Sequence, residues 1–232
     1  MRKLIVIPAR GGSKGIPYKN IYPLSGKPLI EYTLDVIYEA RLSGADTVVS
    51  TDDKKIKDVV KKYKWITVID RPAAISGDTA STEAVLIHAL EYMQEVYGRV
   101  YDAVLTMQAT SPFRRAETFC GFVHSFEQKY PLCDAMLSLN EDRTDFWVRN
   151  DEGGFGRLYP DAPRRRQDRK PLYVENSAYY ITEVTALRET NSVLGNRSEG
   201  YIIPRSEALD INEPMDLIMA ESMIKAKLQM KE

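Results

Sequence analysis

The regular alternation of short apolar runs with longer amphipathic stretches is the feature that most constrains the fold of this chain. Short apolar runs separated by helical patterns are typical of strands joined by crossover helices, which build a mainly parallel sheet. Strands are expected at residues 3–9, 46–50, 65–70, 103–108 and 134–140. Helices are expected from residue 28 to Gly44 and over residues 54–64, 81–97 and 116–129. The pattern therefore predicts a doubly wound, mainly parallel α/β sheet.

The pattern is interrupted at residues 141–170, which carry three glycines, two prolines and many charges without a clear period. An insertion of this length is expected to be disordered, to cover a site or to pair with another subunit. A strand at 172–182, a helix near 183–189, a strand at 201–204 and a last helix from 213 to about 230 complete the pattern. We therefore expect one domain over residues 1–232, with residues 141–170 inserted in it as an arm.

The charge balance and the cysteine content exclude several classes of protein. The chain has 32 Lys and Arg against 33 Asp and Glu, so it lacks the positive field of a nucleic-acid binder. Its apolar runs are too short to cross a bilayer, and neither nucleic acid nor membrane is an expected partner. Two cysteines, Cys120 and Cys133, favour a reducing compartment, and the cytoplasm is the expected location. Cys120 and His124 lack a third ligand nearby, which favours core packing over a metal site.

The loop after the first expected strand has the composition of a polyphosphate cradle. Between residues 10 and 20 it holds three glycines, a serine and three cations. Glycines let backbone N–H groups approach an anion, and the cations neutralise its charge. The spacing fits neither a P-loop nor a dinucleotide fingerprint, so a surface turn with solvated lysines stays the alternative. The candidates are Arg10, Gly11, Gly12, Ser13, Lys14, Lys19 and Asn20.

Ligands of open parallel sheets bind outside the carboxyl ends of the strands, so the later loops are the next candidates. Residues 51–53, with the sequence Thr-Asp-Asp, follow the second strand, and a helix cap is favoured there over a metal site. After the third strand, Arg71 precedes a polar stretch that could contact a base or a ribose. A helix cap explains Ser81 or Thr82 without a ligand, but it does not explain Arg71.

Two further segments carry hydrogen-bonding or charged groups. Gln108, Thr110 and Ser111 follow the fourth strand, where turn chemistry explains only part of the pattern. Residues 164–170 hold five cations, which form either a solvated arm or a clamp for a carboxylate or phosphate.

A third segment lies near the end of the chain. Asp210 and Asn212 precede the last helix and could hold Mg²⁺ against a polyphosphate, although a cap also explains Asn212.

Taken together, five segments resemble the N-acylneuraminate cytidylyltransferases, the CMP-sialic acid synthetases, including the closely similar legionaminic acid enzymes. The likeness spans nearly the whole chain. The motifs occur in the order and spacing of that family: residues 7–15 with Lys19 and Asn20, Arg71 with residues 78–81, Gln108 with residues 110–112, Arg166 and Gln167 followed by Asn176, and residues 210–212. The related KDO cytidylyltransferases share the reaction but have a different first loop.

The resemblance implies a nucleotide-diphospho-sugar transferase-like domain that binds CTP and Mg²⁺, and a homodimer in which the insertion helps to complete the partner's sugar pocket. It assigns the triphosphate and catalysis to Arg10, Lys14 and Lys19, with Gly11, Gly12 and Ser13 beside them. It assigns the nucleoside to Asn20, Arg71 and Ser81, and the acidic sugar to Gln108, Thr110, Ser111, Arg166, Gln167, Asn176 and Tyr180. It assigns the metal, and a part in catalysis, to Asp210, with Asn212 beside it.

Two departures from the family pattern bear on this assignment. Asn212 replaces an expected aspartate, which should weaken or rearrange the metal site. Residues 192–195, Ser-Val-Leu-Gly, are closer to the legionaminic-type enzymes than to those with an aromatic pair.

The reaction implied is transfer of CMP from CTP to the anomeric hydroxyl of a nine-carbon 2-keto acid, with release of pyrophosphate. No general base is assigned, because His88 and His124 lie in helical patterns. The alternatives are a cytidine-nucleotide-binding protein whose turnover is impaired by Asn212, and an interaction protein that uses the basic arm.

Overall fold

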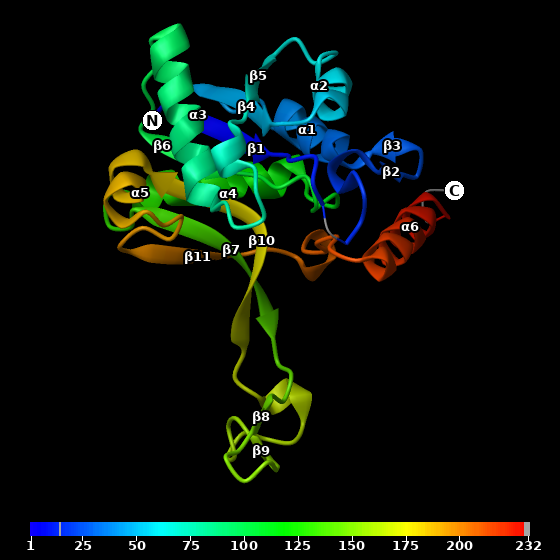
Figure 1. The fold of residues 1–232 in the computed structure, drawn as a ribbon. Helices are drawn as coiled ribbons and strands as arrows, with labels where there is room; N and C mark the ends of the chain where they lie inside the picture. Colours follow the sequence, from blue (N-terminus) through cyan, green and yellow to red (C-terminus); the bar gives the residue numbers. More distant parts are fainter. Residues whose placement is uncertain (14, 230–232) are drawn as a thin grey trace.

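A computed structural model describes residues 1–13 and 15–229, and Figure 1 shows how their elements are arranged. The central sheet has the strand order β11-β7-β10-β6-β1-β4-β5. Its strands are β1 (Lys3–Pro8), β4 (Ala45–Thr51), β5 (Ile66–Asp70), β6 (Ala103–Thr106), β7 (Ala135–Asp142), β10 (Leu172–Glu183) and β11 (Ser198–Ile202). β10 runs antiparallel to both of its neighbours, whereas the other pairs in the sheet are parallel. The predicted mainly parallel α/β sheet is confirmed.

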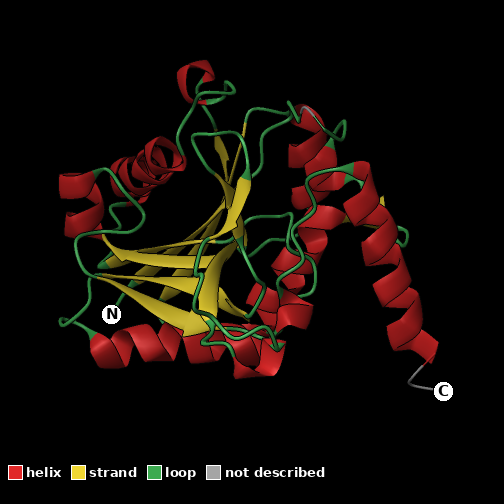
Figure 2. Cartoon of the chain, turned by 90° about the horizontal axis from the view of Figure 1, so that it is seen from below, coloured by secondary structure: helices red, strands yellow, loops and turns green. Residues whose placement is uncertain are grey.

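Helices cover both faces of the sheet, as Figure 2 shows. They are α1 (Leu29–Ala40), α2 (Lys54–Val60), α3 (Thr82–Tyr97), α4 (Ala116–Lys129), α5 (Val184–Thr190) and α6 (Pro214–Gln229). Shorter elements are η1 (Lys19–Ile21), η2 (Ala73–Ile75), η3 (Arg166–Asp168) and η4 (Arg205–Glu207), together with the strand pairs β2 (Pro23–Leu24) with β3 (Lys27–Pro28) and β8 (Trp147–Arg149) with β9 (Phe155–Arg157).

Alternate side chains of the sheet enter two separate apolar cores. Ile5 and Ile7 of β1 pack in the core that contains residues of α1, α2 and α4. Leu4 and Val6 point the other way and pack with α3 and with Leu187 of α5. This two-sided burial explains why β1 is apolar at successive positions, since a strand covered on both faces needs no polar alternation.

Several element boundaries differ from the expected ones. α1 ends at Ala40, because Arg41 adopts a left-handed conformation with φ +47°; Gly44, with φ +69°, lies in the turn that follows. α2 ends at Val60 rather than at residue 64, and β11 covers 198–202 rather than 201–204. The β8–β9 pair inside the insertion was not predicted, and residue 230, the expected end of the last helix, lies outside the described residues.

The insertion forms an arm, defined here as residues 143–171, that projects from the body of the molecule (Figure 1). β7 and β10 pair beyond the body as a ribbon, from Glu175 opposite Leu139 to Leu172 opposite Asp142. β8 and β9 lie at the far end of this ribbon. The arm is therefore a continuation of two central strands.

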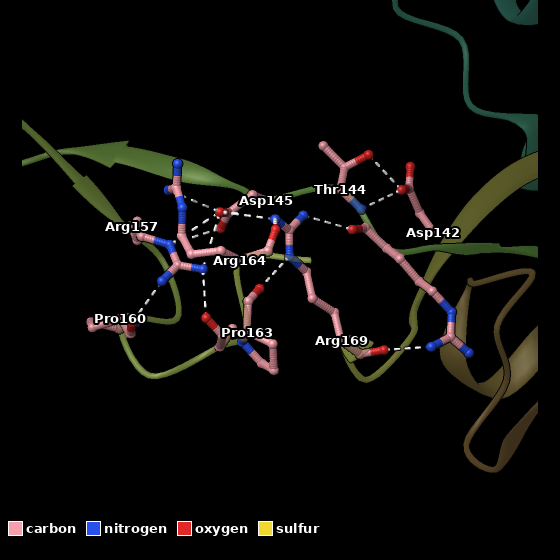
Figure 3. Close-up of polar contacts among 10 residues, drawn as sticks. Asp142, Thr144, Asp145, Arg157, Pro160, Pro163, Arg164 and Arg169 are labelled. Carbon is pink, nitrogen blue, oxygen red and sulfur yellow. Dashed lines mark hydrogen bonds and ion pairs between the residues drawn. The ribbon is translucent and has the colours of Figure 1, made fainter. Parts of the chain in front are cut away.

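A single carboxylate, that of Asp145, organises the arm (Figure 3). It accepts hydrogen bonds from Nε of Arg157 at 3.1 Å and pairs with Arg169 at 3.3 Å. Arg169 also donates to the carbonyl oxygens of Pro163 and Arg143 at 2.8 and 2.9 Å. Two cations that the sequence shows only as part of a charge pattern are thus bound inside the arm.

No helix in the described ranges is long and apolar enough to span a membrane.

Candidate active site

The loops that follow three parallel strands converge on one cleft of about 420 Å³. The cleft lies at the carboxyl ends of β1, β5 and β6, the edge where open parallel sheets bind ligands. Nine of the residues singled out from the sequence line it: Arg10, Ser13, Lys19, Asn20, Arg71, Ser81, Gln108, Thr110 and Asn212. Lys14 is outside the described residues.

The loop after β1 is held by its contacts with two neighbouring segments. The amide of Gly11 donates to Asp52 at 3.0 Å, and a Cβ at Gly11 would lie 2.7 Å from Asp53. A Cβ at Gly15 would lie 2.6 Å from the carbonyl oxygen of Asn212. Both glycines therefore permit a close backbone approach that a side chain would prevent. Gly12, by contrast, has open space around it.

Two polar side chains of the same loop are anchored to backbone carbonyls. Nδ2 of Asn20, a buried side chain, donates to the carbonyl of Arg10 at 2.9 Å. Nζ of Lys19 donates to the carbonyl of Ile211 at 2.8 Å. Burial lowers the pKa of Lys19, while the carboxylates of Asp210 and Asp216 act in the opposite direction. The loop and the segment before α6 are thus joined by a cation.

A second cation, Arg71, is buried beside the end of β4. Its guanidinium donates to the carbonyl of Ser50 at 2.6 Å and to the Ser50 hydroxyl at 3.2 Å. Burial lowers its pKa to about 10, so it stays protonated at neutral pH. Arg10 forms an ion pair with Asp78 at 2.9 Å within the cleft lining. Both cations therefore border the space where a triphosphate could lie.

Both helix caps that the sequence suggested are present. Oδ1 of Asp53 accepts from the amides of Lys55 and Ile56 at 2.7 and 3.1 Å, so the cap favoured for residues 51–53 is confirmed. Ser81 caps α3 through the amide of Ala84 at 3.2 Å, and it also lines the cleft. Among the described residues, no group of three or more His, Cys, Asp or Glu side chains is arranged for a metal.

Asp210 and Asn212 are connected through hydrogen bonds. Nδ2 of Asn212 donates to Oδ2 of Asp210 at 2.8 Å, and its Oδ1 accepts from Nζ of Lys19 at 3.1 Å. The other carboxylate oxygen, Oδ1 of Asp210, is buried and has no hydrogen-bond partner in the described chain. The start of α6 is capped by Asp216, which accepts from the amides of Asn212 and Glu213 at 2.8 and 2.9 Å. A cap formed by the Asn212 side chain is therefore wrong.

The donor set at this position fits one divalent cation. Mg²⁺ prefers carboxylate and phosphate oxygens and keeps several waters, so one protein carboxylate beside a polyphosphate is a common arrangement. The free oxygen of Asp210 meets this requirement. The amide oxygen of Asn212 is already used by Lys19.

The loop after β6 carries two buried hydroxyls without partners. Thr110 and Ser111 are 5% and 1% exposed, and neither hydroxyl oxygen has a partner among the described residues. The carbonyl of Thr110 accepts from the amide of Ile211 at 2.9 Å, which places this loop beside the Asp210 segment. Buried hydroxyls are usually hydrogen-bonded, so the two free ones indicate a missing partner.

The remaining candidates for the sugar lie outside the cleft lining. The Asn176 side chain donates to Asn140 at 2.8 Å and accepts from the Ala178 amide at 3.2 Å. Tyr180 donates to Glu175, and burial together with this hydrogen bond raises its pKa to about 12. Arg166 and Gln167 form part of η3, on the arm.

One buried residue in contact with the cleft lining, Arg114, received no role from the sequence. Arg114 follows Gln108 by six positions, is 4% exposed and donates to the carbonyl of Ala178 at 2.7 Å. Its position in a run of turn residues before a helix gave no periodic signal, because only the tertiary fold buries it.

A doubly wound sheet with a cationic, glycine-containing loop at a cleft is an arrangement suited to nucleotidyl transfer. Comparison with known proteins agrees with this class: the chain belongs to the cytidylyltransferase family, whose model matches residues 4–196. The resemblance recognised from the motifs is confirmed.

Individual relatives also support this membership. The chain is 30% identical to a pseudaminic acid cytidylyltransferase of Campylobacter jejuni and to a CMP-N,N'-diacetyllegionaminic acid synthase of Legionella pneumophila, in each case over 97% of both proteins. It is 29% identical to an N-acylneuraminate cytidylyltransferase of Streptococcus agalactiae, over 94% of this chain and 52% of that protein.

Two solved structures share the fold. A CMP-2-keto-3-deoxy-manno-octonic acid synthetase in complex with CTP superimposes with a TM-score of 0.64 at 18% identity, covering 98% of this chain and all of the other. A 4-diphosphocytidyl-2C-methyl-D-erythritol synthase from Anaerococcus prevotii gives 0.68 at 16% identity, covering 97% and 98%.

Proposed function

We propose that this protein transfers CMP from CTP to the anomeric hydroxyl of a nonulosonic acid, with release of pyrophosphate. The observation that carries the proposal is the single cleft at which the loops after β1, β5 and β6 meet the Asp210 segment. Two relatives that match over nearly their whole length, and a third that this chain covers over 52% of its length, are named for this chemistry with three different sugars. Binding without turnover has no support, because none of these relatives is named as a binding protein.

The chemistry needs positioning and charge neutralisation more than a covalent catalyst. In the proposal, the amides of Gly12 and Ser13 and the side chains of Arg10, Lys14 and Lys19 bind the triphosphate and stabilise the departing pyrophosphate. Asn20, Arg71 and Ser81 orient the nucleoside, and Gln108 contacts the sugar; all four side chains belong to residues that line the cleft.

Asp210 is the side chain proposed to hold Mg²⁺ through its free oxygen. When bound, the ion would neutralise part of the polyphosphate charge. Asn212 acts here as the connection between Lys19 and Asp210.

The arm supports a further part of the proposal, that the protein is a homodimer. The arm exposes large apolar side chains, with Trp147 52%, Phe155 64% and Tyr159 50% exposed. Clusters of this kind usually face another protein surface. Arg166 and Gln167 lie on the same arm and outside the cleft of their own chain. We therefore place them at the acidic end of the sugar in the partner's cleft.

Turnover of CTP with a panel of sugars tests the reaction. Purified protein is incubated with CTP, Mg²⁺ and N-acetylneuraminic, N,N'-diacetyllegionaminic, pseudaminic or 2-keto-3-deoxy-manno-octonic acid, and pyrophosphate is measured. We expect release with at least one nine-carbon acid. CTP binding without release at saturating concentrations of every sugar would refute the proposal. The cytoplasmic location stays a prediction.

Mixing two inactive variants tests the shared site. Arg166→Ala damages the arm and Lys19→Met damages the cleft, so a mixed dimer keeps one site in which both are intact. Equal mixing after subunit exchange should restore about a quarter of the wild-type activity if the two residues come from different chains. Mixtures no more active than the separate variants would place Arg166 in the cleft of its own chain, or outside any site.

A further inference from the structure

Arg114 is a buried cation between the loop after β6 and the start of α4. Its side chain is almost inaccessible to solvent, with 4% exposure. In the described ranges, no carboxylate lies within ion-pair distance of the guanidinium, and its Nε has no hydrogen-bond partner. The Tyr179 ring centroid lies 5.7 Å away. Burial of a cation without a contacting acid costs free energy of folding. The presence of an arginine at this position therefore needs a reason other than stability.

The guanidinium connects two strands at the sugar side of the proposed site. It donates to the carbonyl of Ala178 at 2.7 Å and to the carbonyl of Gln108, which lies just beyond the end of β6 at Thr106. Thr33 of α1 bridges the same groups, because its hydroxyl accepts from Arg114 and lies 3.2 Å from the Gln108 carbonyl. Removal of Arg114 would therefore release the Gln108 loop and the Ala178 segment from each other.

The Ala178 segment is irregular, which makes its position dependent on such contacts. The pairing of β10 with β7 shifts between Glu175 and Tyr180, and Ser177 has a φ of +57°. Because ladder hydrogen bonds are disrupted in a bulge, the side chains within it are placed by other contacts. Arg114 supplies one of them at Ala178.

The charge of Arg114 persists in the folded protein. Burial lowers its pKa to about 10, and the nearby Tyr179 and Asp210 favour the charged form. The group therefore carries a full positive charge at neutral pH. A desolvated charge acts strongly on its surroundings because few water molecules screen it.

The loop that Arg114 fixes contains the two unpaired hydroxyls described above. Thr110 and Ser111 follow Gln108 and Ala109 along the chain, and their hydroxyls are buried without partners in the described part of the structure. Their free oxygens indicate a polar ligand at this end of the cleft. The cation and the unpaired hydroxyls therefore belong to one region.

We propose that Arg114 is a positioning residue for the acidic sugar: it fixes the Gln108 loop and the Ala178 segment, and it places a positive charge behind them. The inference rests on the proposed function, since it assigns the region to the acidic substrate. Nothing requires Arg114 to touch the sugar, and its effect passes through Gln108 and the β10 bulge.

The test separates the two substrates. Arg114→Met keeps a long side chain but removes the positive charge and the N–H donors of the guanidinium. We expect KM for the sugar to rise about tenfold or more and KM for CTP to stay within about twofold. Thr33→Val, which keeps Arg114, should raise KM for the sugar by about two- to threefold. Tyr179→Phe is the matched core control, because the Tyr179 hydroxyl has no hydrogen-bond partner among the described residues, and both KM values should stay unchanged.

The charge is tested with a neutral inhibitor. The sugar acid and its methyl ester are compared as competitors in wild type, Arg114→Met and Arg114→Lys. Loss of the cation in Arg114→Met should weaken the binding of the sugar acid about fivefold more than the binding of its ester. Arg114→Lys should recover part of this difference. Equal losses for acid, ester and CTP would overturn the proposal and identify Arg114 as a residue needed only for folding.

Hydrogen exchange keeps this test separate from the test of the reaction. In Arg114→Met, amides of residues 107–113 and 175–181 should exchange about tenfold faster, and those of β1 and β4 should not change. Uniform acceleration, or none, would refute the positioning role. If wild type turns over no sugar in the panel, the proposed reaction fails, and local exchange still decides whether Arg114 fixes the two segments.

Discussion

The Asn212→Asp variant isolates the connection between Lys19 and Asp210. An amide is the group of this shape that can accept from an ammonium and donate to a carboxylate at once. Asn212 does both, at 3.1 and 2.8 Å. An aspartate at 212 keeps the acceptor and replaces the donor by a charged oxygen facing Asp210. The variant therefore tests whether the neutral residue is needed for the geometry of the site.

The size of the effect follows from the distance. Two carboxylates about 4 Å apart repel by about 1 kcal/mol in water and about 4 kcal/mol at an effective dielectric constant of 20. Asn212 is exposed, so a value near the lower end applies. Loss of the amide hydrogen bond adds about 1 kcal/mol, and attraction to Lys19 offsets a similar amount. We expect the metal-free variant to be about 1 kcal/mol less stable, a fall in Tm of about 2–4 °C for a chain of this size.

Thermal unfolding in EDTA and in 10 mM MgCl₂ measures the effect. Two adjacent carboxylates bind Mg²⁺ more tightly than one, so the ion should raise the Tm of the variant more than that of wild type. Asn150→Asp is the matched control, because it makes the same change on an exposed part of the arm. It should leave the Tm within about 1 °C of wild type under both conditions.

Two results would contradict this reasoning. Equal stability of Asn212→Asp and wild type in EDTA would show that the amide does not connect Lys19 to Asp210. An equal response of both proteins to MgCl₂ would show that residue 212 faces away from the ion.

Three further variants address the loops, the arm and the nucleoside side of the site. Gly15→Ala should lower the free energy of unfolding by about 1–3 kcal/mol, because its Cβ would meet the carbonyl oxygen of Asn212. Gly12→Ala should change this free energy by no more than about 0.5 kcal/mol, because the space around Gly12 is open. Equal losses in the two variants would contradict the close packing of Gly15. Asp145→Asn should speed trypsin cleavage of the arm at neutral pH. Hydrogen bonding by Arg157 lowers the pKa of Asp145. The wild-type arm should therefore be fully protected from cleavage above about pH 4, and this protection should be lost only as the pH falls through the lowered pKa. Loss of the protection already at pH 5 would refute the role of the Asp145 carboxylate. Because a lysine at position 71 cannot make both hydrogen bonds to Ser50, kcat/KM for CTP should fall about tenfold in steady-state assays of Arg71→Lys. A change of less than twofold would place Arg71 outside the site.

The periodic part of the fold was predictable from the sequence because buried strands and amphipathic helices leave local patterns. β1, α3 and α4 lie within a residue or two of their expected positions. The end of α1 was not predictable, since the left-handed residue is Arg41 rather than a glycine. The β8–β9 pair was missed because its strands have three residues each, which is too short for an alternation to be detected.

The site was predictable to the extent that its residues follow parallel strands. Arg71 and Gln108 stand directly after apolar runs, and the topology brings such positions to one edge of the sheet. The partners of Asn212 are not encoded locally, because Lys19 is distant in sequence and meets it only in the folded chain. Arg114 was missed for the same reason, since its burial depends on α1 and β10.

The reversed direction of β10 explains why the arm and the sugar side of the cleft belong to one structural unit. A strand that returns antiparallel to β7 can pair with it beyond the body of the sheet, which produces the ribbon of the arm (Figure 1). The same strand then pairs with β6 through Tyr180 and Thr106, directly before Gln108. Between these two pairings lies the bulge, where Asn176 contacts Asn140 and Arg114 contacts Ala178. Any displacement of the ribbon by a bound partner is therefore transmitted first to the bulge, the segment that carries the proposed sugar contacts.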